Sequence, residues 1–341
     1  MNLSIEQIER IATGVTYADL NDEGRIVLHR FSKAEEEIYE QIKPNFYSKV
    51  FCTSGVKLAF KTDSRTFSMK GFTKGGTTRN YMSVEAYKNG AFVDSFNNYG
   101  HLEIPRLYST LACPIGEFEL SFDLGEGEGL VEIYLPWSVQ LEITSVSIDD
   151  GASLEPVKRD KLLLAYGDSI TQGYDALVSY NRYSARLAEA LGADEHNKAI
   201  GGEIFFPKLG DAADTSLKPD YITVAYGTND WNGRQDTELF KVHVKEFFGA
   251  IRKAYPGVPM FALMPIWRKE ADEGEKPLGS LEGLADKIAE LVADIPDLYV
   301  IKGYDVVPHS EDYFADLHLH PNDAGYGYQA KGFAERIKKL L

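Results

Sequence analysis

The stretch KLLLAYGDSITQG, residues 161–173, joins an apolar run to a polar, glycine-containing turn. The apolar run predicts a buried strand, and Ser169 follows just after the end of that strand. A hydroxyl in such a position can be exposed as a nucleophile, although a serine there is also a common helix N-cap. Thr171 occupies the place of the final glycine in a Gly-x-Ser-x-Gly elbow, so the segment disfavours an ordinary α/β-hydrolase.

Apolar runs alternate with amphipathic helical patterns from this stretch onward. We predict strands at residues 162–166, 197–200, 221–226, 258–264 and 298–301, and helices at 180–191, 237–255, 280–294 and 324–341. Alternation with short links predicts a parallel sheet that is covered by helices on both faces. Sheets of this kind bind ligands at the carboxyl ends of their strands.

The residues before position 161 show a different pattern, in short runs where apolar and polar residues alternate. Such runs predict strands at residues 26–30, 56–61, 117–122, 131–135 and 140–146, and Asn89-Gly90 marks a hairpin. We therefore expect an antiparallel, jelly-roll-like β-sandwich over residues 1–155, with the first twenty residues and 35–41 as peripheral helices or loops. Residues 150–156 are interpreted as a linker to a second domain at 156–341.

The composition limits the class of protein. The 341 residues carry a formal net charge of −16, and 44% of them are hydrophobic. The acidic balance argues against a nucleic-acid partner and gives no reason to expect binding to anionic membranes. Cys52 and Cys113 form no disulfide framework and lack the spacing of zinc ligands. Residues 1–7 lack the features of a secretory signal, so we expect a cytoplasmic protein unless a signal has been removed.

Three further segments are predicted to lie at the same edge of the parallel sheet as Ser169. Residues 197–202 (NKAIGG) end in two glycines that let the backbone approach a ligand closely, or simply make a turn. Residues 226–231 (YGTNDW) place an asparagine where it can stabilise an oxyanion or cap a turn. Residues 316–322 (DLHLHPN) hold a histidine that can act as a general base. The two histidines beside an aspartate also suggest a metal, but no third and fourth ligand is evident.

In order and spacing, the four segments resemble the four blocks of the SGNH (GDSL-type) hydrolase superfamily, over residues 161–341. The resemblance implies that Ser169 is the nucleophile and His320 the base, and that Ser169, Gly202 and Asn229 form the oxyanion hole. It also implies a three-layer α/β/α domain with a parallel, flavodoxin-like sheet. The implied activity is ester hydrolysis that requires no metal or organic cofactor.

One position departs from the family pattern. The family has Asp-x-x-His-Pro, but the residue three before His320 is Leu317, and Asp316 lies four before it. We expect either that a bulged loop brings Asp316 to the imidazole, or that the enzyme uses a Ser–His dyad with a backbone carbonyl to orient the ring. His318 is a minor rival as the base.

The two-domain plan is also similar to carbohydrate esterase family 2 and related bacterial acetyl esterases. Trp231, Trp267 and Arg268 follow predicted strands, so we expect them at the catalytic edge, where exposed indoles would stack on sugars and Arg268 would bond hydroxyls or a carboxylate. The alternative is that the indoles pack under loops, and Trp137 is expected in the sandwich core. No long apolar lid is present, which favours a small acyl group, most simply acetyl, on a small carbohydrate.

Two other functions stay open at this stage. An O-acyltransferase would use the same serine, with a substrate alcohol in place of water. A catalytically inactive glycan-binding protein is disfavoured because the nucleophile, the base and the oxyanion donors all are present. The sequence leaves the oligomeric state open.

Overall fold

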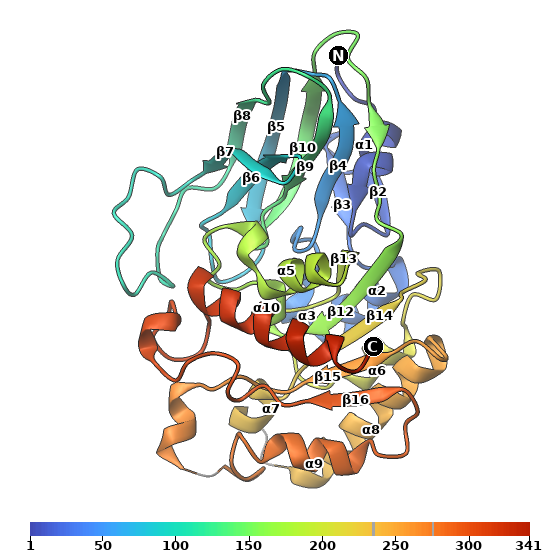
Figure 1. Ribbon diagram of the computed structural model, residues 1–341, viewed down its shortest axis with the longest axis vertical. Helices are drawn as coiled ribbons and strands as arrows, with labels where there is room; N and C mark the ends of the chain where they lie inside the picture. The colour runs from blue at the N-terminus through green and yellow to red at the C-terminus, as the bar shows by residue number, and fades with distance from the viewer. Residues whose placement is uncertain (234–235, 275) are drawn as a thin grey trace.

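The computed structural model describes residues 1–233, 236–274 and 276–341. Within these residues, two antiparallel sheets make up the upper part of the molecule in Figure 1, and a parallel sheet with helices makes up the lower part. The structure is therefore of the mixed α/β class that the sequence predicts. The boundary predicted between residues 155 and 156 stays a prediction.

The antiparallel strands are β1 (Ala12–Thr13), β2 (Tyr17–Leu20), β3 (Ile26–His29), β4 (Lys57–Thr62), β5 (Thr66–Gly75), β6 (Ser83–Lys88), β7 (Ala91–Asn97), β8 (Glu117–Asp123), β9 (Gly129–Tyr134), β10 (Val139–Ile148) and β11 (Glu155–Pro156). The parallel strands are β12 (Lys161–Gly167), β13 (Ala193–Asn197), β14 (Tyr221–Ala225), β15 (Met260–Leu263) and β16 (Leu298–Ile301). The α-helices are α1 (Ile5–Ile11), α2 (Lys33–Ile42), α3 (Pro44–Val50), α4 (Ser169–Gln172), α5 (Tyr183–Ala190), α6 (Pro207–Asp211), α7 (Thr228–Gly233), α8 (Thr237–Ala254), α9 (Leu284–Leu291) and α10 (Asp323–Lys338). The 3₁₀ helices are η1 (Ser179–Asn181), η2 (Lys269–Glu273) and η3 (Glu311–Tyr313).

The two antiparallel sheets enclose a common apolar core. One sheet has the order β1-β4-β9-β6-β7, with β11 also paired to β4, and the other has the order β2-β3-β10-β5-β8. Phe60 of the first sheet and Phe67 of the second lie 6.2 Å apart between ring centroids, and both are fully buried. The predicted hairpin is present, because Asn89 and Gly90 have positive φ angles of 52° and 78° between β6 and β7. Strand β5 was not predicted, since its glycines and lysines interrupt the alternation.

The parallel sheet has the order β13-β12-β14-β15-β16, which is the flavodoxin-like order. Leu163 points to the face covered by α5 and α10, and Leu164 to the face covered by α6, α8 and α9. Helix α10 crosses in front of the sheet in Figure 1. Neighbouring residues of one strand thus point to opposite faces of the sheet. Because helices cover both faces, both sets of side chains are buried, which explains the long apolar runs in the sequence.

Strand β13 lies about four residues before its predicted position, because its sequence, ADEHN, is polar although all five residues are buried. The polar side chains are satisfied by partners from other elements. Arg182 pairs with Glu195, and the His196 ring nitrogen Nε2 lies 2.7 Å from the carbonyl oxygen of Arg30. A hydrophobicity pattern cannot detect a buried strand of this kind.

The expectation of peripheral helices or loops is wrong for both stretches. In the first twenty residues, strands β1 and β2 pair within the antiparallel sheets, and Ile8 and Ile11 of helix α1 are fully buried.

Helices α2 and α3 are not peripheral either, which corrects the expectation for residues 35–41. Glu35 and Lys198 form an ion pair at 2.6 Å with both side chains fully buried. Tyr39 is also fully buried, and its ring lies 6.0 Å from that of Phe206, just before helix α6. The Arg30 guanidinium donates to the carbonyl oxygens of Asn197 and Ala199. The N-terminal part of the chain therefore contributes to the core of the catalytic part.

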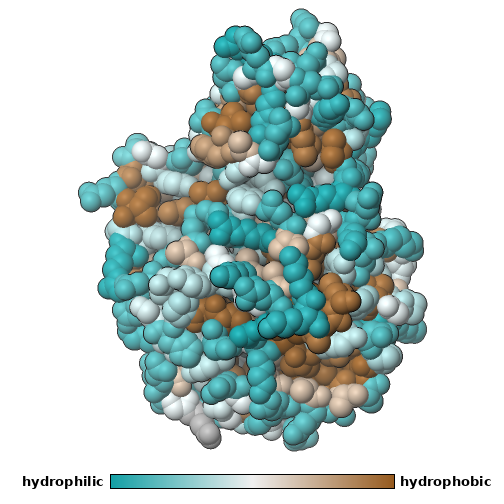
Figure 2. Space-filling model, viewed as in Figure 1, coloured by the Kyte–Doolittle hydropathy of each residue, from teal (hydrophilic) through white to brown (hydrophobic). Residues whose placement is uncertain are grey.

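The face of the molecule seen in Figure 2 is mainly hydrophilic, and its apolar residues lie in separate patches. Among the described residues, no helix has the length and apolar character needed to cross a bilayer.

Candidate active site

Ser169 begins the short helix α4 directly after strand β12. Asp168 caps this helix, because its carboxylate accepts the Ile170 N–H at 2.9 Å. Burial raises the pKa of Asp168 to about 7. The helix ends after about one turn at Gly173, whose φ of 110° lies in the left-handed region. The strand and the capped turn hold the Ser169 side chain in one place, at 4% exposure.

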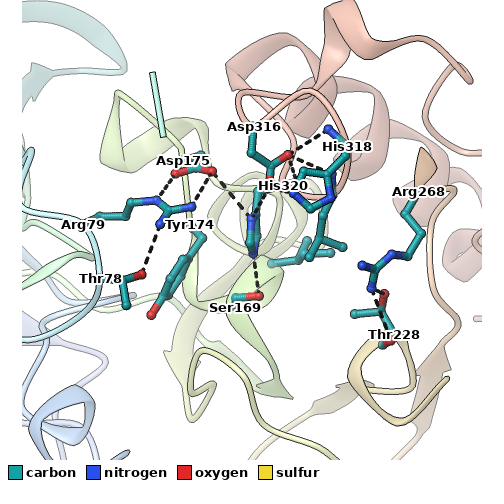
Figure 3. A network of polar contacts seen from close by, with 12 residues as sticks. Thr78, Arg79, Ser169, Tyr174, Asp175, Thr228, Arg268, Asp316, His318 and His320 are labelled. Atoms are coloured by element: carbon teal, nitrogen blue, oxygen red, sulfur yellow. Dashed lines mark hydrogen bonds and ion pairs between the residues drawn. The ribbon is translucent and has the colours of Figure 1, made fainter. Parts of the chain in front are cut away.

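His320 lies between Ser169 and a carboxylate (Figure 3). Its Nε2 is 2.8 Å from the Ser169 Oγ, and its Nδ1 is 2.6 Å from Oδ2 of Asp316. A carboxylate only accepts, so Nδ1 carries the hydrogen and Nε2 is free to accept the serine proton. The Tyr174 ring stacks on the imidazole with the centroids 5.4 Å apart. These contacts have the geometry of a Ser–His–Asp triad.

The loop from Asp316 to His320 accommodates the extra residue in the spacing. Leu317 has a φ of 63°, which is left-handed and unfavourable for leucine. The backbone N–H groups of His318, Leu319 and His320 all donate to Oδ1 of Asp316, at 3.0, 2.8 and 3.0 Å. These donors and the His320 imidazole hold the pKa of Asp316 well below its usual range, although burial opposes them. The structure thus places Asp316 as the bulged-loop alternative requires.

The rival base, His318, faces away from the nucleophile. Its Nδ1 lies 2.9 Å from Glu270 and its Nε2 lies 3.4 Å from Oδ2 of Asp316. Both ring nitrogens therefore face carboxylates, and the imidazole that contacts Ser169 is that of His320.

The expected oxyanion donors lie at the starts of helices α4 and α7 and in the loop that follows strand β13. Within the described part of the chain, neither the Ser169 N–H nor the Gly202 N–H has a hydrogen-bond acceptor. The Asn229 amide donates to the carbonyl oxygen of Glu203 at 2.9 Å, which ties the start of helix α7 to the Gly202 loop. The amide has a second N–H to offer. Gln172 accepts the Gly201 N–H at 2.7 Å and so fixes the same loop from helix α4.

The prediction of exposed indoles at this edge is wrong. Trp231 has no exposed surface and donates its Nε1–H to the Gly279 carbonyl at 2.8 Å. Trp267 is 4% exposed and stacks on His309, with the centroids 5.3 Å apart. Trp137 is buried as expected, but it packs with the core of the catalytic part rather than with the sandwich core. Each indole buries a large apolar surface under an adjoining loop, which stabilises the fold more than exposure would.

Arg268 also differs from its prediction as a contact for hydroxyls or a carboxylate of the substrate. It is 3% exposed and forms an ion pair with Glu270 at 3.0 Å. It also donates to the Thr228 hydroxyl at 3.2 Å (Figure 3). Its guanidinium is therefore occupied by partners in the protein.

A second carboxylate, Asp175, lies beside the imidazole and was not predicted. Its Oδ2 is 3.6 Å from Nδ1 of His320. The sequence offers no direct signal for it, because its cation partner Arg79 lies far away in the chain, in the N-terminal part. The only local signal is its place in the turn that follows Gly173.

Asp175, Asp316 and His320 bring three possible metal ligands within 4.8 Å of one another. Arg79 and Tyr81 donate to Asp175, and the three backbone N–H groups and His320 donate to Asp316. The oxygens are therefore engaged by hydrogen-bond donors, an arrangement suited to orienting an imidazole rather than to binding a cation.

Comparison with known proteins gives a family for the C-terminal part and a fold for the whole chain. Residues 165–328 match the GDSL-like Lipase/Acylhydrolase family. No curated protein matches the chain. The solved structures that are similar in fold include the salicylyl-acyltransferase SsfX3 from a tetracycline biosynthetic pathway, at 21% identity over 97% of this chain and 95% of that one, with a TM-score of 0.78.

Two family two carbohydrate esterases also share the fold. The enzyme from Cellvibrio japonicus is 14% identical over 100% of this chain and 97% of its own, with a TM-score of 0.67. The enzyme from Clostridium thermocellum, solved in complex with cellohexaose, is 18% identical over 84% of this chain and 93% of its own, with a TM-score of 0.63. At these identities the similarity concerns the two-part fold. The shared fold places antiparallel sheets before a parallel sheet, as in these carbohydrate esterases. The family match shows that residues 165–328 of this chain belong to the GDSL-like lipase/acylhydrolase family.

Proposed function

We propose that the protein is a serine esterase that removes small acyl groups, most simply acetyl, from carbohydrates through an acyl-serine intermediate. The observation that carries the proposal is the continuous hydrogen-bond chain from Asp316 through His320 to Ser169. These hydrogen bonds bring a nucleophile, a base and an orienting acid together at one point of the fold.

Acylation begins when Ser169 Oγ attacks the ester carbonyl carbon and His320 Nε2 takes the serine proton. The carbonyl oxygen becomes negative, and the N–H groups of Ser169 and Gly202 and the Asn229 amide stabilise it. Each such donor is typically worth roughly 3 kcal/mol of transition-state stabilisation. Asp316 stabilises the imidazolium that forms during the attack.

The intermediate then collapses. The bond from the carbonyl carbon to the sugar oxygen breaks, and His320 gives its proton to that oxygen. Water next donates a proton to His320 as its oxygen attacks the acyl carbon. When the second intermediate collapses, the acid leaves and Ser169 regains its proton.

The proposal of a small acyl group is supported by the surroundings of Gly202. A side chain at this position would begin 3.3 Å from Cζ of Phe46, so that aromatic ring lies close to the proposed oxyanion donor. Such a ring limits the space for a long acyl chain. The carbohydrate is supported by the fold shared with family two carbohydrate esterases, one of them bound to cellohexaose.

An acyltransferase is the second candidate, because the salicylyl-acyltransferase SsfX3 shares the fold over nearly the whole chain. In that reaction a substrate alcohol replaces water in the second step, and Ser169, His320 and Asp316 keep the same roles. Adding a competing acceptor alcohol to the esterase assay separates the two activities, because a transferase yields an acylated acceptor.

The direct test is the hydrolysis of p-nitrophenyl esters by the wild type and the Ser169→Ala variant. We expect cleavage of the acetyl ester far faster than the octanoyl ester, and a loss of at least about a thousandfold in kcat for Ser169→Ala. Ser121→Ala changes an exposed serine on the outer strand β8 and serves as the matched control. Unchanged turnover by Ser169→Ala would remove this residue from the mechanism, and faster octanoyl cleavage would refute the small acyl group.

The sugar is identified by measuring acetate release from a panel of acetylated oligosaccharides, with the deacetylated position read by NMR. Release from the panel is expected to require Ser169. Activity on simple esters combined with no acetate release from any member would reject the carbohydrate substrate.

A further inference from the structure

The base His320 is contacted by two carboxylates, and the second has no part in the triad. Oδ2 of Asp175 lies 3.6 Å from the same Nδ1 that Asp316 contacts at 2.6 Å. Asp175 is fully buried, and its φ of 71° shows that the turn after helix α4 holds it in a left-handed conformation. A buried carboxylate in such a conformation persists only when its surroundings determine it strongly.

The surroundings of Asp175 come from the N-terminal part of the chain. Arg79 binds it with two nitrogens, Nε to Oδ1 at 2.5 Å and Nη2 to Oδ2 at 3.2 Å (Figure 3). The Tyr81 hydroxyl also donates to Oδ1, and the Tyr108 hydroxyl donates to the backbone carbonyl of Asp175 at 2.8 Å. A two-point contact from a guanidinium fixes both the position and the orientation of a carboxylate.

The segment that carries these donors packs against buried aromatic rings. Arg79 and Tyr81 lie between strands β5 and β6 of the antiparallel sheets. Tyr81 is fully buried and packs edge-on against Trp137, with the centroids 6.1 Å apart. The Arg79 guanidinium lies 5.5 Å from the centre of the Tyr174 ring, which itself stacks on His320. The N-terminal part thus supports the two neighbours of the imidazole that lie outside the triad.

We propose that Arg79, Tyr81 and Asp175 are positioning residues through which the N-terminal β-sandwich sets the orientation and the proton affinity of His320. This inference rests on the proposed function, in which His320 becomes an imidazolium in each acyl-transfer step. The Asp175 charge stabilises that imidazolium from a second direction. Arg79 holds Asp175 at 3.6 Å, so that Asp316 keeps the hydrogen bond to Nδ1.

The charges around His320 determine in which direction each substitution should change the proton affinity of its ring. Two carboxylates, those of Asp316 and Asp175, face its Nδ1, and Asp168 lies near it at the start of helix α4. Arg79 contacts Asp175 from the other side, and His318 contacts Asp316. A nearby negative charge raises the pKa of an imidazole, and a nearby positive charge lowers it. Removing Asp175 and removing Arg79 should therefore change the proton affinity of His320 in opposite directions.

The experiment measures the pH dependence of kcat/KM for p-nitrophenyl acetate in the full-length protein and its variants. Activity needs neutral His320, so the acidic limb of the profile follows its pKa. Asp175→Asn should move this limb to lower pH by roughly one unit and lower kcat about tenfold. Arg79→Gln should move it to higher pH by roughly half a unit, and the limb of the double variant should lie between those of Asp175→Asn and the wild type.

The matched controls are Arg65→Gln and Asp123→Asn, which break an exposed ion pair in the same sandwich and should leave the limb in place. Tyr81→Phe keeps the ring and removes only the hydroxyl donor to Asp175, so it should shift the limb slightly to higher pH. This variant decides the matter if the charge variants do not fold. The proposal would be overturned by a limb that stays in place in every folded variant, by limbs of Asp175→Asn and Arg79→Gln that move in the same direction, or by a limb of Tyr81→Phe that moves to lower pH.

NMR titration of the His320 ring, assigned with the His320→Asn variant, separates failure of this inference from failure of the proposed function. If the wild type hydrolyses no ester, the proposed function fails, and the ring titrations still test the coupling. Opposite shifts of the His320 pKa in Asp175→Asn and Arg79→Gln support the coupling, and equal or absent shifts refute it.

Discussion

Asp316 uses its two oxygens for different purposes. Oδ1 accepts three successive backbone N–H groups, and Oδ2 faces Nδ1 of His320. The loop reaches this arrangement only because Leu317 adopts a left-handed conformation, which costs roughly 1–2 kcal/mol. The cluster of charge-assisted hydrogen bonds at Oδ1 offsets that cost.

We predict that Asp316→Asn loses nearly as much activity as His320→Ala. The asparagine oxygen must face the three N–H donors, so its NH₂ group would face Nδ1 and favour the wrong imidazole tautomer. By analogy with known triads, the expected loss in kcat is on the order of 10⁴-fold. Ester hydrolysis by both variants is the measurement, with the exposed Asp312→Asn as the control. An Asp316→Asn variant that keeps most of its activity would instead indicate a Ser–His dyad.

At the scale of elements, helix α4 follows strand β12 of the parallel sheet and leads into the turn of Asp175, which contacts Arg79 of the N-terminal part. It starts at an Asp168 cap, carries Ser169 in its first turn, and ends at Gly173. A Cβ on Gly173 would overlap the Arg182 side chain, whose guanidinium binds Glu195 of the edge strand β13. Ser169 is thus held by a short helix whose end, at Gly173, has no room for a side chain.

We predict that Gly173→Ala destabilises the protein by several kcal/mol, because it combines left-handed strain with a steric overlap. Gly192→Ala is the matched control, since Gly192 also has a positive φ, 68°, but no atom lies within 4 Å of the added Cβ. The control should lose only about 1 kcal/mol. Chemical denaturation of both variants measures the free energy of unfolding, and equal losses would contradict the packing argument.

On the scale of the whole molecule, the antiparallel and parallel parts are joined by buried polar contacts as well as by apolar ones. Glu35 of helix α2 pairs with Lys198 at the end of strand β13, and neither side chain is exposed. Burial lowers the pKa of Lys198, although its pairing with Glu35 opposes this effect. An unpaired ammonium at this place would be costly.

Glu35→Leu should therefore lower the free energy of unfolding by about 3–5 kcal/mol, since it leaves Lys198 buried and unpaired. The double variant Glu35→Leu/Lys198→Met should recover much of that loss, because no charge stays buried. Glu128→Leu, which breaks an exposed pair with Lys61, should leave the stability close to that of the wild type. A double variant that is less stable than Glu35→Leu would show that the pair is not the cause.

Much of the catalytic half could be predicted from the sequence because its signals are local. The apolar runs before Ser169 and Asn229 gave strands β12 and β14 to within a residue or two at each end, and the strand at 298–301 has the predicted bounds. Strand β13 was misplaced because its buried residues are polar and find their partners elsewhere in the fold. The cytoplasmic location stays a prediction.

The order of the four segments by itself determined a sheet edge that carries Ser169, Asn229 and His320, since parallel strands must present their carboxyl ends together. Only the tertiary structure decided that Asp316 reaches His320 through a left-handed Leu317, and that both predicted indoles are buried. It alone also placed Asp175 and Arg79 beside the base. The physical reason is that a hydrophobic period or a motif reports on neighbours in the chain. The partners of a buried charge or a large ring are set by which surfaces meet in three dimensions, and no local pattern encodes them.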